Sequence, residues 1–356
     1  MQFFNYIVIE GRYTLSRYEW PSLFEKPMEE KTSYLNVDGL VEHLHENGIS
    51  ISGDEQIRDL INFGYYHGYK GYRSFKPTKT VVPFADFREI SATIRYDSEL
   101  KAILYPKLMF IETALESIIP QKIAEVTKSG TLVSMMNSAI ENYQRCDQTL
   151  PRSKKTEKQN NFFRLQKDLE NSISRAYSKD NPIITHFINN SGRDLPIWAL
   201  FEILSLGEVE TILKDSVFDV REAVSEVFGI EKKDDTNRDF LVVMMKQLRF
   251  LRNAVAHNDI VYDIRFKRND APKSVYELLR RFGGLPSFQC ESIFEYFVLL
   301  SWFMKQLGCS KEEITDFLRS YEKATDDYKQ KIPSAIQDVT VLKDYNELVS
   351  KVILNL

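Results

Sequence analysis

Apolar residues recur at helical spacing along most of the chain, and this pattern predicts an all-α fold. The longest such stretch runs from residue 87 to residue 119, where apolar side chains mostly fall three or four positions apart. Pro106 lies inside this stretch, so we expect the helix to kink there or to divide in two. The chain has 14 glycines and 12 prolines among 356 residues, and this scarcity favours long helices over short strands and tight turns.

Capping and stop signals place the ends of several other helices. Asn36 precedes a helix that we expect to end at Asn47, and Ser310 with Glu313 forms a capping box for another helix. Residues 197–206 follow a proline and are apolar nearly all round, so we expect this helix to lie deep in the core. Another helix is expected to begin near residue 53. Four more are expected over residues 240–256, 291–307, 310 to about 321, and 339–356.

Two segments have a less helical pattern. Residues 1–28 are rich in aromatic and β-branched side chains, which indicates a short β-hairpin or an extended arm. Residues 73–85 contain two prolines and are expected to form a loop, with or without a strand. We find no Gly/Ser-rich or Pro-rich linker, so we expect the regions of the chain to pack together as one unit. These regions are an N-terminal, mainly helical part (1–140), a basic connecting segment (141–190) and a helical domain (191–356).

Charge and cysteine content narrow the function classes. The chain has 47 Lys and Arg against 51 Asp and Glu, and this balance argues against coating nucleic acid by bulk electrostatics but leaves room for a local basic site. No apolar run is long enough to span a membrane and no secretory signal is recognisable, so we expect a cytoplasmic protein without a membrane partner. The cysteines Cys146, Cys290 and Cys309 are too few and too widely spaced for a disulfide framework or a zinc site.

Basic residues gather in two stretches that are candidates for RNA contact. Within residues 144–167 we expect a mobile loop or an exposed helix start, which is either a solvated connection or a nucleic-acid contact. The run from residue 151 to residue 167 contains a single acid, Glu157. Its basic residues are Arg152, Lys154, Lys155, Lys158, Arg164 and Lys167. The second stretch contains Arg265, Lys267, Arg268, Lys273, Arg280 and Arg281.

The strongest candidate for chemistry is an Arg-x4-His spacing, formed by Arg252 and His257 at the end of the 240–256 helix. An arginine at the end of a buried helix needs an anion or a carboxylate, because an unpaired buried charge is costly. On an ideal helix residues five apart point about 140° away from each other, so the two side chains flank a face rather than share a stripe. Two copies that meet antiparallel about a two-fold axis could combine two such pairs in one composite site.

This pair could cleave RNA without a metal ion. Arg252 would bind the scissile phosphate in a forked contact, and His257 would act as general base on the 2′-hydroxyl or as acid on the leaving 5′-oxygen. The products would carry a 2′,3′-cyclic phosphate and a 5′-hydroxyl, and Asn253 would orient either group or cap the backbone. The alternative is structural, with Arg252 in a core ion pair and His257 as a helix-terminal residue.

Other catalytic or binding motifs are weaker. We find no phosphate-binding glycine loop, no His-Glu metal motif and no Gly-x-Ser-x-Gly nucleophile motif, so we expect neither a metal nor another cofactor. His43 and His45 flank a leucine in a pattern typical of a helix surface. Residues 61–73 interleave aromatic and basic side chains, as in a base-stacking surface or in an aromatic packing corner, and the second interpretation is favoured.

Three blocks of the sequence together resemble bacterial abortive-infection (Abi) proteins of the AbiD/AbiF type. The blocks are residues 60–72, residues 96–100 through 111–115, and the pair 195–207 and 251–257, and they cover roughly residues 30–265 in the order of that family. The chain departs from the family pattern at His67, where the family has arginine, and at Asn258, where it commonly has a second aromatic or histidine residue.

The resemblance implies that residues 191–356 form a HEPN domain, a helical bundle that typically dimerises and builds a ribonuclease site from two Arg-x4–6-His motifs. It implies an anti-phage, toxin–antitoxin-like role, in some members tied to a small noncoding RNA. Glu202 matches a family acid and is expected either to pair with Arg252 or to face solvent. We therefore expect a homodimeric, metal-independent endoribonuclease with Arg252, His257 and Asn253 in its site. The alternatives are a non-catalytic scaffold for a cognate small RNA and a toxin restrained by an antitoxin.

Overall fold

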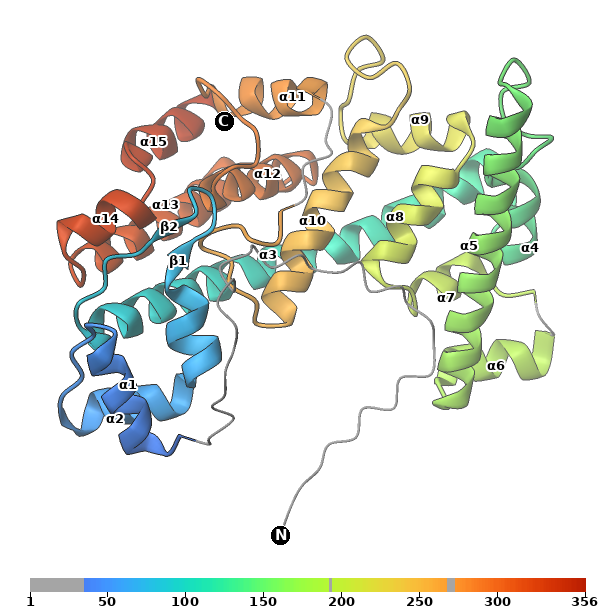
Figure 1. The fold of residues 1–356 in the computed structure, drawn as a ribbon. Helices are drawn as coiled ribbons and strands as arrows, with labels where there is room; N and C mark the ends of the chain where they lie inside the picture. Colours follow the sequence, from blue (N-terminus) through green and yellow to red (C-terminus); the bar gives the residue numbers. More distant parts are fainter. Residues whose placement is uncertain (1–34, 192–193, 268–272) are drawn as a thin grey trace.

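The computed structural model describes residues 35–191, 194–267 and 273–356, and the hairpin or arm expected in residues 1–28 lies outside them. The described part consists of helices and one two-stranded antiparallel sheet, which confirms the all-α prediction (Figure 1). The elements in chain order are α1 (Val37–Glu46), α2 (Gly53–Phe63), the π-helix η1 (Tyr65–Lys70), β1 (Ser74–Phe75), β2 (Thr80–Val81), α3 (Phe87–Thr127), α4 (Leu132–Ser134), the π-helix η2 (Met135–Ala139), α5 (Arg152–Ser178), α6 (Pro182–Ser191), α7 (Ile197–Phe201), α8 (Leu206–Asp215), α9 (Phe218–Val227), α10 (Phe240–Ala256), α11 (Lys273–Gly283), α12 (Ile293–Gln306), α13 (Lys311–Lys329), α14 (Ser334–Thr340) and α15 (Tyr345–Asn355).

Helix α3 is the long axis of the molecule. Its 41 residues extend about 60 Å at the usual rise of an α-helix, and a complete capping box, Asp86 with Glu89, fixes its start. Pro106 does not divide this helix. Pro106 is exposed, whereas Leu104 and Leu108 are buried on the core side, so packing on both sides of the proline holds the helix together.

Many of the other helices pack along α3, and the helices together form an arch (Figure 1). Helices α7, α8, α9, α10, α12 and α13 all contact α3. One continuous cluster of buried apolar side chains extends from Leu44 in α1 to Val352 in α15. The helices α1 and α2 form one limb of the arch, α5 and α6 form the other, and the C-terminal end of α10 points to the inner side between them (Figure 1).

Several helix boundaries agree with the cap and stop signals. Asn36 caps α1 through its side chain, Ser310 and Glu313 form the expected capping box of α13, and α10 covers residues 240–256. The loop expected at residues 73–85 contains the small hairpin β1–β2. Helix α13 continues beyond residue 321 to Lys329.

One prediction about helices was wrong, and another had to be resolved between two alternatives. The segment 197–206 is not one buried helix, because α7 ends at Phe201 and Ser205 then caps α8 through a capping box. Trp198 in α7 is 54% exposed. Of the two alternatives for residues 144–167, the exposed helix start is confirmed, because the second part of the segment begins the 27-residue helix α5, anchored by buried Leu165 and Leu169.

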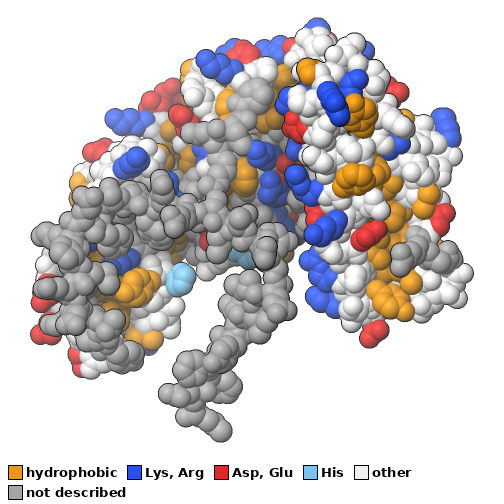
Figure 2. Space-filling view, turned by 45° about the vertical axis from the view of Figure 1, so that its right-hand side comes forward, with side chains coloured by type: hydrophobic (Ala, Val, Ile, Leu, Met, Phe, Trp, Pro, Cys, Tyr) orange, Lys and Arg blue, Asp and Glu red, His pale blue; other side chains and the backbone are white. Residues whose placement is uncertain are grey.

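None of the helices in the described ranges is both long and apolar enough to cross a membrane. The three cysteines have free thiols. Figure 2 shows that the described part is hollowed between the two limbs, with Lys and Arg side chains gathered on the wall of the α5–α6 limb.

Candidate functional site

The Arg-x4-His motif lies at the C-terminal end of α10, where the helix unwinds. His257 is the C-cap residue, and its backbone N–H donates to the carbonyl of Asn253 at 2.9 Å. Asn258 then adopts a left-handed backbone with φ of 57°, which ends the helix. Arg252 therefore lies just before the last turn of α10, while His257 is exposed at the end of the helix. Asn253 contributes its backbone to this cap, and its side chain bonds to none of the described residues.

Arg252 is anchored to α3 by one nitrogen. Its Nε donates to Oε2 of Glu112 at 3.0 Å, and the side chain of Glu112 is 9% exposed. The side chain of Arg252 is 32% exposed, and within the described ranges its two terminal nitrogens have no hydrogen-bond partner. The ion pair satisfies the buried carboxylate and leaves the fork of the guanidinium available to an incoming anion.

Two further carboxylates surround this ion pair. Glu116 lies one helical turn after Glu112 on the same face of α3. Partial burial, followed by the charges of Glu112 and Glu202, raises the pKa of Glu116 to about 7, and the charge of Arg252 opposes the shift. The partner of Arg252 is thus Glu112, while Glu202 is exposed and acts on the cluster through its charge.

A buried aspartate fixes the segment that follows His257. Asp97 of α3 is fully buried, and its Oδ1 accepts the backbone N–H groups of Val261 and Tyr262 at 2.8 and 2.7 Å. Its Oδ2 accepts the hydroxyl of Tyr72 at 2.8 Å and pairs with Lys101 at 2.8 Å. These contacts satisfy a charge that would otherwise be costly to bury.

The same network reaches the residue next to the motif histidine. Lys101 Nζ donates to Oδ1 of Asn258 at 2.8 Å, so the left-handed residue beside His257 is tied to the Asp97–Lys101 pair. In the sequence, Asp97 stands out only through its place in residues 96–100, one of the blocks that resemble the family. An acid at a core-facing helical position with a lysine four residues later was the signal that could have identified it.

Several basic side chains in the first turns of α5 already have partners within the protein. Lys154 pairs with Glu157, and Lys158 pairs with Glu141. Lys155 donates to a glutamine amide, and Arg152 is exposed. Helix α5 begins at the end of its limb opposite α6, so these turns do not adjoin the end of α10 (Figure 1).

The second basic stretch also has acidic partners. Arg265 forms two hydrogen bonds, of 2.9 and 2.7 Å, with the fully buried Asp263, and Lys267 lies 4.0 Å from Glu291. Arg268 lies outside the described residues. Farther along, Arg280 pairs with Glu277, Arg281 pairs with Asp234, and Lys273 is exposed.

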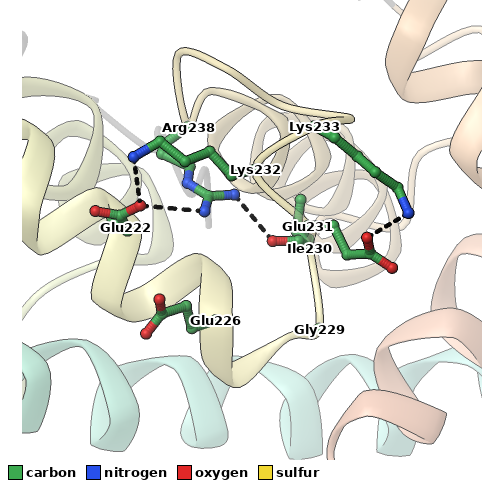
Figure 3. A pocket seen from close by; sticks show the side chains of 8 residues that line it. All are labelled: Glu222, Glu226, Gly229, Ile230, Glu231, Lys232, Lys233 and Arg238. Atoms are coloured by element: carbon green, nitrogen blue, oxygen red, sulfur yellow. Dashed lines mark hydrogen bonds and ion pairs between the residues drawn. The ribbon is translucent and has the colours of Figure 1, made fainter.

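A separate depression of about 560 Å³ lies at the opposite end of α10 (Figure 3). Arg238 donates to the carbonyl of Ile230 at 2.9 Å and pairs with Glu222, which also pairs with Lys232 at 3.2 Å. Along the helix Arg238 is about 20 Å from Arg252, so the depression is not part of the motif site. Among the residues that the structure describes, no group of three or more His, Cys, Asp or Glu side chains is arranged to hold a metal ion.

Comparison with known proteins identifies the family. A family model described as Abi-like protein matches residues 58–263, a range that contains Arg252, His257, Glu112 and Asp97. No curated protein and no solved structure is significantly similar to the chain. The family match covers more than half of the chain, and the chain therefore belongs to the Abi-like protein family.

Proposed function

We propose that this protein acts in abortive infection, the self-limiting defence of bacteria against phage, by binding RNA and cleaving it at Arg252 and His257. Membership of the Abi-like family supports the defence role. One observation carries the ribonuclease proposal. An arginine held by a single nitrogen, with its fork unpaired in the described part of the chain, lies in the helical turn next to an exposed histidine.

The chemistry needs a phosphate-binding cation and proton transfer. The terminal nitrogens of Arg252 bind the scissile phosphate, and its charge stabilises the negative charge that develops there. The 2′-oxygen attacks phosphorus while its proton passes to a base, and the phosphorus–O5′ bond breaks as an acid protonates O5′. The ends are a 2′,3′-cyclic phosphate and a 5′-hydroxyl, and no step needs a metal ion.

Two proton transfers need two groups, and one copy of the motif supplies one histidine. We propose that a second copy of the chain brings its own end of α10 to the same phosphate, as in the dimeric HEPN arrangement. The exposed position of His257 at the tip of a helix supports this role, because such a residue can meet its counterpart across a two-fold axis.

The test compares wild-type protein with Arg252→Ala and His257→Ala, using cleavage of total RNA in EDTA and toxicity on expression in bacterial cells. Arg319→Ala and His186→Ala are matched controls, because both residues are exposed on helices away from the motif. We expect EDTA-insensitive cleavage by the wild type and both controls, and loss of cleavage and toxicity in both motif variants. Unchanged cleavage in the motif variants would refute the proposal.

Two other outcomes would replace it. If no condition gives cleavage but a discrete RNA co-purifies and survives both substitutions, the protein is a scaffold for that RNA. If cleavage appears only after a bound protein is removed, the chain is a toxin restrained by an antitoxin. A strictly monomeric protein at micromolar concentration would contradict the two-copy site.

A further inference from the structure

Helix η1 presents an aromatic side chain to solvent. Gly64, with φ of 73°, ends α2, and the chain then enters a π-helix, a rare conformation that is frequent at functional sites. Tyr69 and Tyr72 point inward and are 2% and 4% exposed, as the aromatic-corner interpretation predicts. Tyr66 is 74% exposed, the largest exposed fraction of any aromatic side chain in the described ranges. The segment is therefore an aromatic corner on one side and an open aromatic surface on the other.

Cations lie beside these rings. Lys70 Nζ is 5.4 Å from the ring centroid of Tyr65 and 5.3 Å from that of Tyr66. The guanidinium of the exposed Arg73 lies 5.9 Å from the ring of Tyr69. No carboxylate in the described part of the chain pairs with Lys70 or Arg73, so both charges remain available to an anion.

The neighbouring Arg95 also lies beside a ring but, unlike Lys70 and Arg73, has an acidic partner in the described part of the chain. Arg95 lies 5.6 Å from the ring of Phe63, but its guanidinium is bound at 2.8 and 2.9 Å by the carboxylate of Asp59. Its charge is thereby neutralised within the protein. Tyr66, Lys70 and Arg73 thus combine an open ring with two cations that have no acidic partner in the described ranges, and we call these three residues the tyrosine surface.

The tyrosine surface adjoins the segment that follows His257. A side-chain carbon placed on Gly71 would lie 3.2 Å from Cδ1 of Ile260 and 3.3 Å from the carbonyl oxygen of Tyr66. The end of η1 therefore packs against a residue three positions after the motif histidine. The ring of Tyr72 also stacks on Tyr262 at a centroid distance of 5.7 Å. In Figure 1 the chain between α2 and β1 lies near the C-terminal end of α10.

We propose that the tyrosine surface stacks unpaired bases of the RNA that the proposed function requires, on which this inference rests. Every base has a ring face that can stack on Tyr66, and Lys70 and Arg73 can neutralise the phosphates on either side. A duplex offers no free ring faces between its base pairs, so the site selects unpaired strands. A strand held here continues past Ile260 toward His257, which places single-stranded RNA at the cleavage motif.

The test measures binding of a fluorescent 12-nucleotide oligouridine and of an RNA duplex of the same length, using fluorescence anisotropy. All proteins carry His257→Ala so that the RNA stays intact. The variants are Tyr66→Ala, Tyr66→Phe, and Tyr177→Ala as a control at another exposed tyrosine, 41% exposed on α5 and outside both basic stretches. We expect Tyr66→Ala to weaken oligouridine binding by about tenfold or more. Tyr66→Phe and Tyr177→Ala should stay within about twofold of the parent, and duplex binding should not change.

Other results would overturn the inference. Equal binding of oligouridine by Tyr66→Ala and its parent would remove the stacking role, and an equal loss for single strand and duplex would indicate plain charge attraction. A change in oligomeric mass without a change in RNA binding would make the surface a protein interface instead. The ribonuclease proposal fails separately. If wild-type protein cleaves no RNA while Tyr66→Ala still loses oligouridine binding, the stacking site is supported and the ribonuclease proposal fails. If wild-type protein cleaves RNA while Tyr66→Ala binds oligouridine normally, the ribonuclease proposal is supported and the stacking site fails.

Discussion

Replacing Asp97 by asparagine should destabilise the protein strongly. The change removes the negative charge that faces Lys101 at 2.8 Å, in a site where Asp97 is 0% exposed and Lys101 is 9% exposed. The amide oxygen can still accept the backbone N–H groups of Val261 and Tyr262, but the amide nitrogen then faces Tyr72 or Lys101 as a second donor. Breaking a buried ion pair from one side typically costs about 3–5 kcal/mol.

The assay is urea unfolding followed by circular dichroism, with Glu157→Gln as control. Both substitutions turn a carboxylate into an amide opposite a lysine, but Glu157 and its partner Lys154 lie on the surface, where such a pair contributes little. We expect Asp97→Asn to lower the free energy of unfolding by about 3–5 kcal/mol with an unchanged denaturant slope. Equal stability of wild type and Asp97→Asn, or an equally large effect in the control, would refute the reasoning.

The same variant should also reduce cleavage at temperatures where it stays folded. Lys101 holds Asn258 beside His257, so a displaced Lys101 loosens the position of the histidine while the Arg252–Glu112 pair remains. We expect the single-turnover cleavage rate to fall by at least about tenfold, with RNA affinity within about threefold of wild type. A parallel loss of affinity would show that the variant disrupts the site as a whole.

Three other predictions test separate parts of the site. Because the pKa of Glu116 is raised to about 7, the folded protein holds a proton there that the unfolded chain releases at lower pH, and its stability should fall as pH rises through 7. RNA affinity should fall over the same pH range, because a negative charge forms near Arg252. In parallel titrations, Glu116→Gln should lose this pH dependence of both stability and RNA affinity. Arg252→Lys keeps the charge but not the fork, so single-turnover cleavage should fall by at least about tenfold while filter binding of RNA changes less. Gly71→Ala places a carbon 3.2 Å from Ile260 and should lower the free energy of unfolding by about 1 kcal/mol, whereas Gly130→Ala meets nothing within 4 Å and should not; equal melting of the two variants would contradict this packing.

The sequence predicted the helices whose signals are local. Helix α10 was predictable because apolar residues recur at helical spacing up to Ala256 and the polar residues after His257 end it. Helix α3 continues past the predicted end at residue 119 to Thr127, and it stays undivided at Pro106 because the effect of a proline depends on the neighbours that pack around it. The short α7 was missed because the apolar run continues across the Ser205–Glu208 capping box, where α8 begins.

The site was only half predictable, for a physical reason. The spacing of Arg252 and His257 is visible along the chain, but the partner of the arginine, Glu112, is 140 positions away. The network around Asp97 likewise joins it to Val261 across 164 positions. Periodicity describes which face of a helix is buried, but it does not show which distant face packs against it.

The same limit applies to the charged and aromatic stretches. Composition alone did not show that Lys158 is paired with Glu141 and Arg265 with Asp263, whereas Lys70 has no acidic partner among the described residues. It also did not separate the buried Tyr72 from the exposed Tyr66. Both distinctions depend on how segments far apart in the chain pack together.

The most direct test of the ribonuclease proposal is the chemistry of the RNA ends. A defined single-stranded RNA is incubated with wild-type protein in EDTA, and the fragments are weighed by mass spectrometry, with His257→Ala and His186→Ala in parallel. The account predicts fragments with a 2′,3′-cyclic phosphate and a 5′-hydroxyl from the wild type and His186→Ala, and intact RNA from His257→Ala. Fragments with a 5′-phosphate, cleavage that requires a divalent metal ion, or the same fragments from His257→Ala would contradict it.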